Sequence, residues 1–292
     1  MPARSDATWL AARALAESRE QMVTLALSMA SKVAIRFPTG PVPASTTAFR
    51  PATSATERIL ATVAAAVVLH PFESSITDTR IGPKKASLEK CDIGLGAGVV
   101  KGAYAQLPRY FADVDQVMDF EARLVHCMVT LQGFDRAQVV KSPFSGAGQR
   151  QTEIEAMTAF LVEESRGMPI SVPQSHQRER DAFERGKRLF YMRSGPYDFA
   201  CSTCHGVDNQ RIRLQDLPNF EKAPPAQRAF STWPAYRVSQ GALRTMQWRL
   251  NDCFRQQRWP EPVFISQGTI DLITFLGVKA AGGKMDSPAI KR

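Results

Sequence analysis

The sequence is short of cysteine and of long apolar runs. Its 5 Cys in 292 residues are too few for a small domain held together by many disulfides. No uninterrupted apolar stretch reaches the roughly 18 to 20 residues that cross a bilayer, so we expect no membrane span. The 18 Gly and 19 Pro follow no period, which argues against collagen-like and repeat proteins.

Acidic residues are also in deficit. Asp and Glu number 28 against 37 Lys and Arg, which gives a net charge of +9. This charge suits an anionic partner, although it identifies neither a nucleic acid nor a small oxyanion. The apolar fraction of 44% and the charged fraction of 22% are usual for a globular protein. The length allows about two domains.

Residues 1–70 differ in composition from the rest of the chain. They include a run of mostly small apolar residues at 59–69, preceded by Arg50 and Arg58. A basic flank before a short apolar core is typical of a secretory signal, but this core lies far from the first residue. A translation start at Met29 would resolve the discrepancy, and a buried helix is the alternative. We leave 1–70 as a leader or unplaced segment with a possible signal sequence.

Helical patterns begin further along the chain. Thr152 and Glu155 have the spacing of a capping box, so we expect a helix over 152–166. The polar segment 167–185 contains two prolines and the charged run Arg178–Arg180, and we expect it to be an exposed linker. Two more helices are predicted, at 181–193 and 268–278.

The chain also carries an internal echo. A shift of 126 residues places 107–127 on 233–253. Five ungapped matches follow, at Pro108, Tyr110, Arg123, Leu124 and Cys127. The echo predicts two related halves, 71–170 and 171–292.

The strongest chemical signal is a Cys-x-x-Cys-His motif formed by Cys201, Cys204 and His205. This pattern attaches haem c through its two thiols, and its imidazole binds the iron. The alternatives are a redox dithiol and half of a zinc site. A zinc site would need two more ligands nearby, and the sequence has no second Cys-x-x-Cys.

The segment before the motif favours haem over a thioredoxin-like dithiol, because it is helical rather than a strand. Gly186, Leu189 and Phe190 lie on one face of the expected helix. Such a face precedes the haem motif in small cytochromes, and we expect the helix at 268–278 to cross it.

A low-spin haem takes a second axial ligand. Cys253 is a candidate, as are Met246, Met285 and His176. Arg249 lies one turn before Cys253, and a cationic setting stabilises a thiolate and can hold an oxyanion. A buried inert cysteine is the alternative.

Cys91 and Cys127 remain. Haem c is attached outside the cytoplasm, where spare thiols tend to oxidise, so a Cys91–Cys127 disulfide is the simplest assignment. Two separate buried thiols are the alternative. His126, next to Cys127, has no haem motif beside it, and we expect a structural role for it.

Several stretches resemble the SoxA family of c-type cytochromes. They are RLFYMRSGPYDFACSTCHG, STWPAYRVSQGALRTMQWRLNDCFRQQRWPEP, KCDIGLGAGVVKGAYAQLPRYF and the ending PAIKR. The resemblance covers about 85–292, and residues 1–70 have no counterpart.

The resemblance implies a mainly α protein of two cytochrome-c-like domains, with one covalently bound haem c in the C-terminal domain. A single motif is typical of members in which a disulfide, here Cys91–Cys127, replaces a first haem. His205 would be the proximal ligand and Cys253 the distal ligand and catalytic sulfur, which the family carries as a persulfide. Arg249 would be the active-site arginine. From charge alone, we expect Arg255 or Arg258 to help Arg249 hold a dianionic substrate.

The resemblance further implies a periplasmic L-cysteine S-thiosulfotransferase. Such an enzyme couples thiosulfate oxidatively to a cysteine of the carrier SoxY and passes electrons to haem and to a small partner cytochrome, SoxX. We expect no nucleic-acid partner. Two alternatives remain: an electron-transfer cytochrome without catalysis, and a thiosulfate dehydrogenase that forms tetrathionate.

Overall fold

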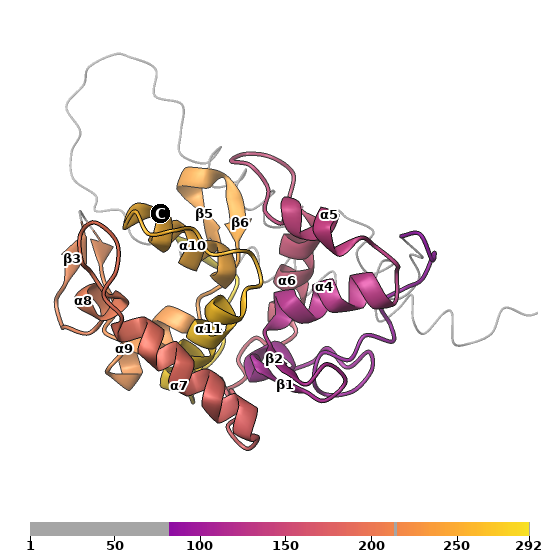
Figure 1. Cartoon of the computed structure of the whole chain (residues 1–292), viewed down its shortest axis with the longest axis horizontal. Helices are drawn as coiled ribbons and strands as arrows, with labels where there is room; N and C mark the ends of the chain where they lie inside the picture. Colours follow the sequence, from indigo (N-terminus) through magenta and orange to yellow (C-terminus); the bar gives the residue numbers. More distant parts are fainter. Residues whose placement is uncertain (1–81, 213–214, 292) are drawn as a thin grey trace, which may run out of the picture. The chain divides into compact units, whose positions relative to one another are not determined.

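Helices dominate the computed structural model, which describes residues 82–212 and 215–291 (Figure 1). The α-helices are α4 Phe120–Thr130, α5 Arg136–Lys141, α6 Glu153–Glu163, α7 Gln177–Tyr191, α8 Cys201–His205, α9 Ala223–Phe230, α10 Met246–Gln256 and α11 Gln267–Lys279. Short 3-10 turns are η1 Tyr104–Gln106 and η2 Val238–Gln240. The strands are β1 Arg109–Phe111, β2 Gln116–Met118, β3 Arg211–Ile212, β4 Gln215–Asp216, β5 Ala235–Arg237, β6 Ala242–Arg244 and β7 Ala289–Lys291. The apolar run at 59–69 lies outside the described residues.

No helix in the described ranges is both long enough and apolar enough to cross a membrane.

Two of the expected helices form close to where the sequence places them. Thr152 caps α6 by accepting from the backbone N–H of Glu155, whose carboxylate accepts from the N–H of Thr152, so the predicted capping box is confirmed. The prediction of a helix at 268–278 is confirmed by α11.

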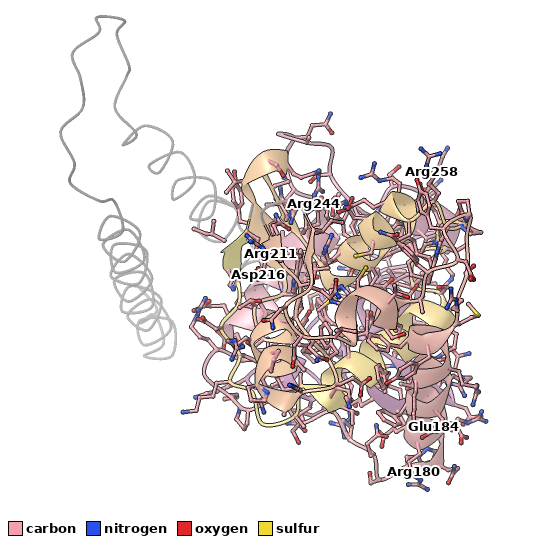
Figure 2. The ribbon with its side chains drawn as sticks, turned by 90° about the vertical axis from the view of Figure 1, so that its left-hand side faces the viewer. Arg180, Glu184, Arg211, Asp216, Arg244 and Arg258 are labelled. Carbon is pink, nitrogen blue, oxygen red and sulfur yellow. A yellow bond between two sulfur atoms is a disulfide. The ribbon has the colours of Figure 1, made fainter. Side chains whose placement is uncertain are left out.

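The expected exposed linker at 167–185 is wrong in two respects. Ile170 is 2% exposed and exchanges backbone hydrogen bonds with the segment 282–283, so the chain is packed there. The helix α7 also begins earlier than expected, because the His176 ring caps it and Glu179 completes a capping box. Arg180 projects outward from the first turns of α7 (Figure 2), whereas Glu179 in the middle of the charged run is buried.

The helices α7 and α11 lie side by side (Figure 1), and a glycine sets how closely they approach. A Cβ added at Gly186 would lie 2.0 Å from the carbonyl oxygen of Asp271. Only glycine therefore fits at this crossing. Next to it, Arg185 forms an ion pair with the buried Asp271 carboxylate at 2.6 Å. The predicted crossing of the two helices is confirmed.

The internal echo appears in the structure as a repeated unit. A hairpin, β1–β2, leads into α4, and a second hairpin, β5–β6, leads into α10. The bounds of all three elements differ by the same 126 positions between the two units. Asp115 and Gly241, also 126 positions apart, both have positive φ at the hairpin turns. The two units therefore have the same backbone arrangement, which the chain repeats.

The two units contact each other reciprocally at the start of their helices. The amide of Gln247 donates to Asp119 at 2.6 Å, and the hydroxyl of Thr245 donates to Glu121 at 3.1 Å. Under the 126-residue shift Asp119 corresponds to Thr245, and Glu121 corresponds to Gln247. The contact of Asp119 with Gln247 is therefore equivalent to the contact of Thr245 with Glu121. That exchange is the signature of a two-fold contact between equivalent surfaces.

Two hydrophobic cores accompany the two units. The first is built mainly on β1, β2, α4 and α6, and the second on α7, α9, α10 and α11. Each core takes a few side chains from the other half of the chain, such as Ile270 in the first and Ala105 in the second. The buried ion pair of Arg244 with Glu155, at 2.9 Å, further ties β6 to α6.

Cys91 and Cys127 are joined in a disulfide across 36 residues, which confirms the predicted pairing. The bond attaches the segment before β1 to the buried face of α4.

Replacing Gly186 by Ala should lower the stability of the fold by about 1–3 kcal/mol, because the new methyl group forces α7 away from α11. Gly268→Ala is the matched control, since its Cβ would meet Leu189 at an ordinary 3.7 Å. Thermal unfolding of both variants checks the prediction. Equal melting temperatures for the two would contradict it.

Stability should also depend on pH through Glu121. Burial, followed by the nearby Asp119 carboxylate, raises the pKa of Glu121 well above its ordinary value. A carboxyl group whose pKa is raised in the folded state stabilises the fold at low pH. This stabilisation is lost as the pH rises through the pKa of the folded state. Glu121→Gln should therefore gain stability relative to the parent protein between about pH 5 and 8, by on the order of 1 kcal/mol.

The control for this pH series is Glu89→Gln, which removes the same charge from an exposed position. Urea unfolding at each pH gives the difference between variant and parent. A Glu121→Gln difference that stays constant across the range would refute the assignment.

Candidate functional site

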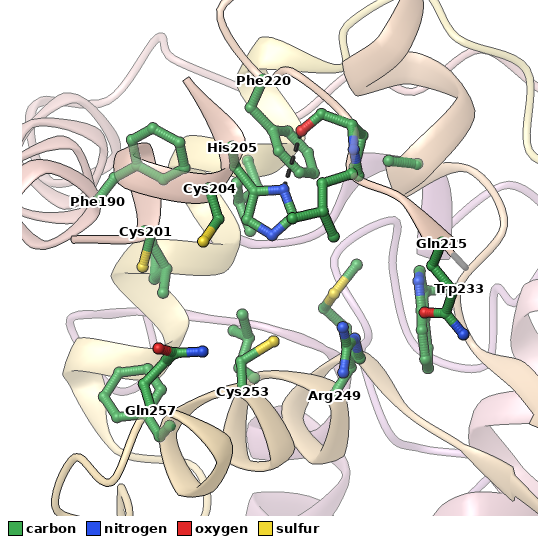
Figure 3. Close-up of a pocket in the computed structure, with 18 of the residues that line it drawn as sticks. Phe190, Cys201, Cys204, His205, Gln215, Phe220, Trp233, Arg249, Cys253 and Gln257 are labelled. Atoms are coloured by element: carbon green, nitrogen blue, oxygen red, sulfur yellow. Dashed lines mark hydrogen bonds between the residues drawn. The ribbon is translucent and has the colours of Figure 1, made fainter. Parts of the chain in front are cut away.

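A cavity of about 440 Å³ opens between α8 and α10. Figure 3 shows Cys201, Cys204 and His205 on one side, with Cys253 and Arg249 facing them from the other. The apolar walls include Phe190, Phe220, Trp233, Leu250, Trp259 and Leu272. The cavity has the size of a small-molecule or cofactor site, for which roughly 300–1,000 Å³ is usual.

The short helix α8 presents the motif to the cavity. Its first turn is closed by Thr203, whose hydroxyl accepts from the N–H of Ala200 at 3.0 Å. The ring of His205 is oriented by a 2.9 Å hydrogen bond between its Nδ1 and the carbonyl oxygen of Pro218. Since a carbonyl only accepts, Nδ1 carries the proton and Nε2 keeps a free lone pair.

Burial keeps the His205 ring neutral. It lowers the pKa of His205 below its ordinary value, and the charge of Arg249 across the cavity lowers it further. The hydrogen bond to Pro218 acts in the opposite direction but does not prevail. A neutral imidazole with a fixed tautomer is the state that binds a metal.

The helix α10 supplies the opposite wall. Thr245 caps it, and Arg249 and Cys253 follow at a spacing of four, so both lie on the face toward the cavity. Arg249 pairs with the buried carboxylate of Asp252 at 3.0 Å and lies 6.0 Å from the Trp233 ring centre. These contacts hold its guanidinium at the cavity edge.

In the folded chain, burial outweighs the expected stabilisation of a Cys253 thiolate by nearby cations. Arg249 and Arg237 do lower the pKa of Cys253, but burial raises it by more. The protein alone therefore favours the neutral thiol.

Of the other candidate iron ligands, Met246 lies at the cavity, and Met285 and His176 do not. Met246 lines the cavity, but Met285 is 2% exposed and does not line it. His176 caps α7 and stacks on Tyr110 with ring centres 3.7 Å apart, away from the site. His126 lies beside Asp113, 3.7 Å away, in the first half of the chain.

The arginines expected to assist Arg249 are not the ones at the site. Arg255 pairs with Asp252 at 2.6 Å, and Arg258 is exposed at the surface (Figure 2); neither lines the cavity. Arg237 from β5 and Lys291 from β7 line it instead. Sequence reasoning missed both, because only the strand pairing in the folded chain shows that they reach the cavity. The available signal was that Arg237 lies in the quoted stretch STWPAYRVSQG and Lys291 in the ending PAIKR.

Known proteins resemble this chain over most of its length. A family model described as "SoxA/TsdA, cytochrome c domain" matches residues 75–170. The L-cysteine S-thiosulfotransferase subunit SoxA of Hydrogenophilus thermoluteolus is 50% identical over 214 residues, which cover 73% of this chain and 78% of that protein. The chain belongs to the SoxA family.

A SoxA of Hydrogenobacter thermophilus is 32% identical over 194 residues, covering 66% of this chain and 69% of that protein. The crystal structure of SoxXA from P. pantotrophus has a similar fold, with a TM-score of 0.62 at 18% identity. The matched region covers 81% of this chain and 80% of the chain in that crystal structure.

The cytochrome c domain of the SoxA family implies haem c, and the cavity residues fit such a group. Cys201 and Cys204 are free thiols that line one wall, and the walls around them are largely apolar. His205 offers an unprotonated Nε2, and Cys253 faces it from the far wall. Among the described residues, no cluster of three or more His, Cys, Asp or Glu side chains is arranged to hold a metal ion by itself.

Proposed function

We propose that this chain carries one haem c, bonded covalently to Cys201 and Cys204, in its C-terminal half. His205 would hold the iron from the motif side and Cys253 from the opposite side. The support is the arrangement of all four side chains around one cavity. Haem c bound there would supply one-electron oxidation.

The proposed domain organisation is two cytochrome-c-like domains, 71–170 and 171–292. The repeated unit and the two cores support it. In the first domain the Cys91–Cys127 disulfide stands in place of a haem. Cys127 and Cys253 occupy equivalent positions 126 residues apart, so the same position is cross-linked in one domain and free in the other.

The proposed activity is that of an L-cysteine S-thiosulfotransferase acting in the periplasm. The observation that carries it is the free thiol of Cys253, one helical turn from Arg249 and facing the haem motif. A simple electron carrier has no need of a cysteine and an arginine at that point. The named SoxA relatives agree with this activity.

In the reaction, a sulfur–sulfur bond forms between the outer sulfur of thiosulfate and the cysteine of a SoxY-type carrier. The carrier thiol releases its proton to solvent, and two electrons leave. Cys253 would meet the outer sulfur of thiosulfate inside the cavity, and Arg249 would bind an oxygen of its sulfonate. The apolar walls keep water from the reacting sulfurs.

The two electrons need a second acceptor, because one haem takes only one at a time. A small SoxX-type cytochrome is the proposed partner, in line with the SoxXA complex that shares this fold. The net charge of +9 would favour the approach of thiosulfate rather than indicate a nucleic-acid partner.

Intact-mass spectrometry of the denatured protein should find one covalently bound haem. Replacing both Cys201 and Cys204 by Ala should abolish the covalent attachment, because each thiol forms one thioether. Cys253→Met is the matched control, since it also removes a cavity thiol but should keep the haem. A second covalent haem, or none, would contradict the proposal.

Replacing Cys253 by Met should reduce thiosulfate conjugation to the carrier by about a thousandfold or more, as expected for loss of the reacting sulfur. Met246→Leu removes the thioether sulfur that also lines the cavity and should keep both the haem spectrum and most of the conjugation. Conjugation is followed by the mass of the carrier.

Two results would favour the alternatives. Undiminished conjugation by Cys253→Met would remove its catalytic role and leave an electron-transfer cytochrome. Free tetrathionate formed without any carrier would indicate a thiosulfate dehydrogenase.

A further inference from the structure

The two repeated units differ in the charge that they place beside their equivalent cysteines. Both have an arginine one turn before the cysteine, Arg123 in the first unit and Arg249 in the second. The shared arginine therefore does not explain what distinguishes the second unit. The position of Arg237 is filled by Phe111 in the first unit, 126 residues earlier.

The second unit also has an additional strand. β7 pairs in parallel with β5, whereas β1 and β2 form a two-stranded sheet in the described part of the chain. The register of that pairing makes Lys291 the direct partner of Arg237. Side chains of directly paired residues emerge on the same face of a sheet. Both side chains line the cavity with Arg249 and Cys253.

These cations lack acidic partners. Among the described residues no Asp or Glu forms an ion pair with Arg237 or Lys291, and the nearby Asp252 is engaged by Arg249 and Arg255. The Nε of Arg237 is buried and has no hydrogen-bond partner. A buried donor without a partner costs free energy that a bound acceptor would recover.

The electrostatic environment of these cations also favours a bound anion. Burial lowers the pKa of Lys291, and the charges of Arg249 and Arg237 lower it further. Burial and Arg249 likewise lower the pKa of Arg237, and the opposite effects of Asp252 and Cys253 are smaller. Mutual repulsion among three cations is relieved by an anion bound between them. A dianion matches this cluster better than a monoanion.

We propose that Arg237 and Lys291, together with Arg249, form the site that binds the oxyanion end of the sulfur substrate beside Cys253. This inference rests on the proposed function and names the residues that would select a sulfonate-bearing dianion. The outer sulfur of the bound anion is then directed toward Cys253. A haem propionate offers the same oxyanion chemistry, and the experiment separates the two sources.

The test uses the haem-loaded complex with its small partner cytochrome and compares Arg237→Gln, Lys291→Gln and the double variant. The KM for thiosulfate in carrier conjugation should rise about ten- to a hundredfold in each single variant, the loss expected for a charge-assisted hydrogen bond. The kcat and the reduction potential of the haem should change little. Salt should affect the KM of the double variant less than that of the parent.

Lys284→Gln is the matched control. It removes one positive charge from an exposed position on the same C-terminal segment, outside the cavity lining. Its KM should stay within about twofold of the parent value, as for a surface substitution. A rise equal to that of Lys291→Gln would mean that net charge alone steers thiosulfate, and would overturn the site.

Calorimetric titration of the oxidised complex with thiosulfate, without carrier, gives a Kd that does not depend on turnover. Weaker binding in the variants supports the site even if the parent protein fails to conjugate, a failure that would refute only the proposed function. Unchanged Kd and KM in a conjugating protein would overturn the site alone. Unchanged binding with an altered haem potential or spectrum would assign the cations to the propionates and also overturn it.

Discussion

The reciprocal contact of α4 with α10 is the constraint on which the rest of the fold depends. Asp119 accepts from Gln247 while Glu121 accepts from Thr245, and all four side chains are buried. Because Thr245 is also the cap of α10, this contact fixes where that helix begins. The start of α10 in turn determines which of its side chains face the haem motif. The contact between the units and the geometry of the cavity are therefore parts of one arrangement.

The two units show how one backbone plan serves two purposes. In the first, the cysteine of the helix is locked in a disulfide that holds the preceding segment. In the second, the equivalent cysteine is free, and an added strand brings charge to it. Aromatic Phe111 suits a core, whereas Arg237 at the same place suits a cavity. The positive charge beside Cys253 thus comes from Arg237 in place of Phe111 and from Lys291 on the added strand β7.

Local signals made much of this predictable from the sequence. The capping box at Thr152, the haem motif and the 126-residue echo each depend on residues close together or on direct repetition, and the structure contains the corresponding elements. The packed segment around Ile170 and the cations of β5 and β7 could not be predicted in the same way. They depend on pairing between distant strands and loops, which periodicity does not encode.

The order of the cavity walls along the chain bears on how the protein matures. Phe190 precedes the motif, but Trp233, Trp259 and Leu272 follow it, and together they surround Cys201 and Cys204. A rigid macrocycle bonded to those thiols is larger than the gaps between packed side chains. It would have to be joined to the chain before the later segments close over it. Ligation of the proposed haem would then precede the final packing of these later segments around the motif.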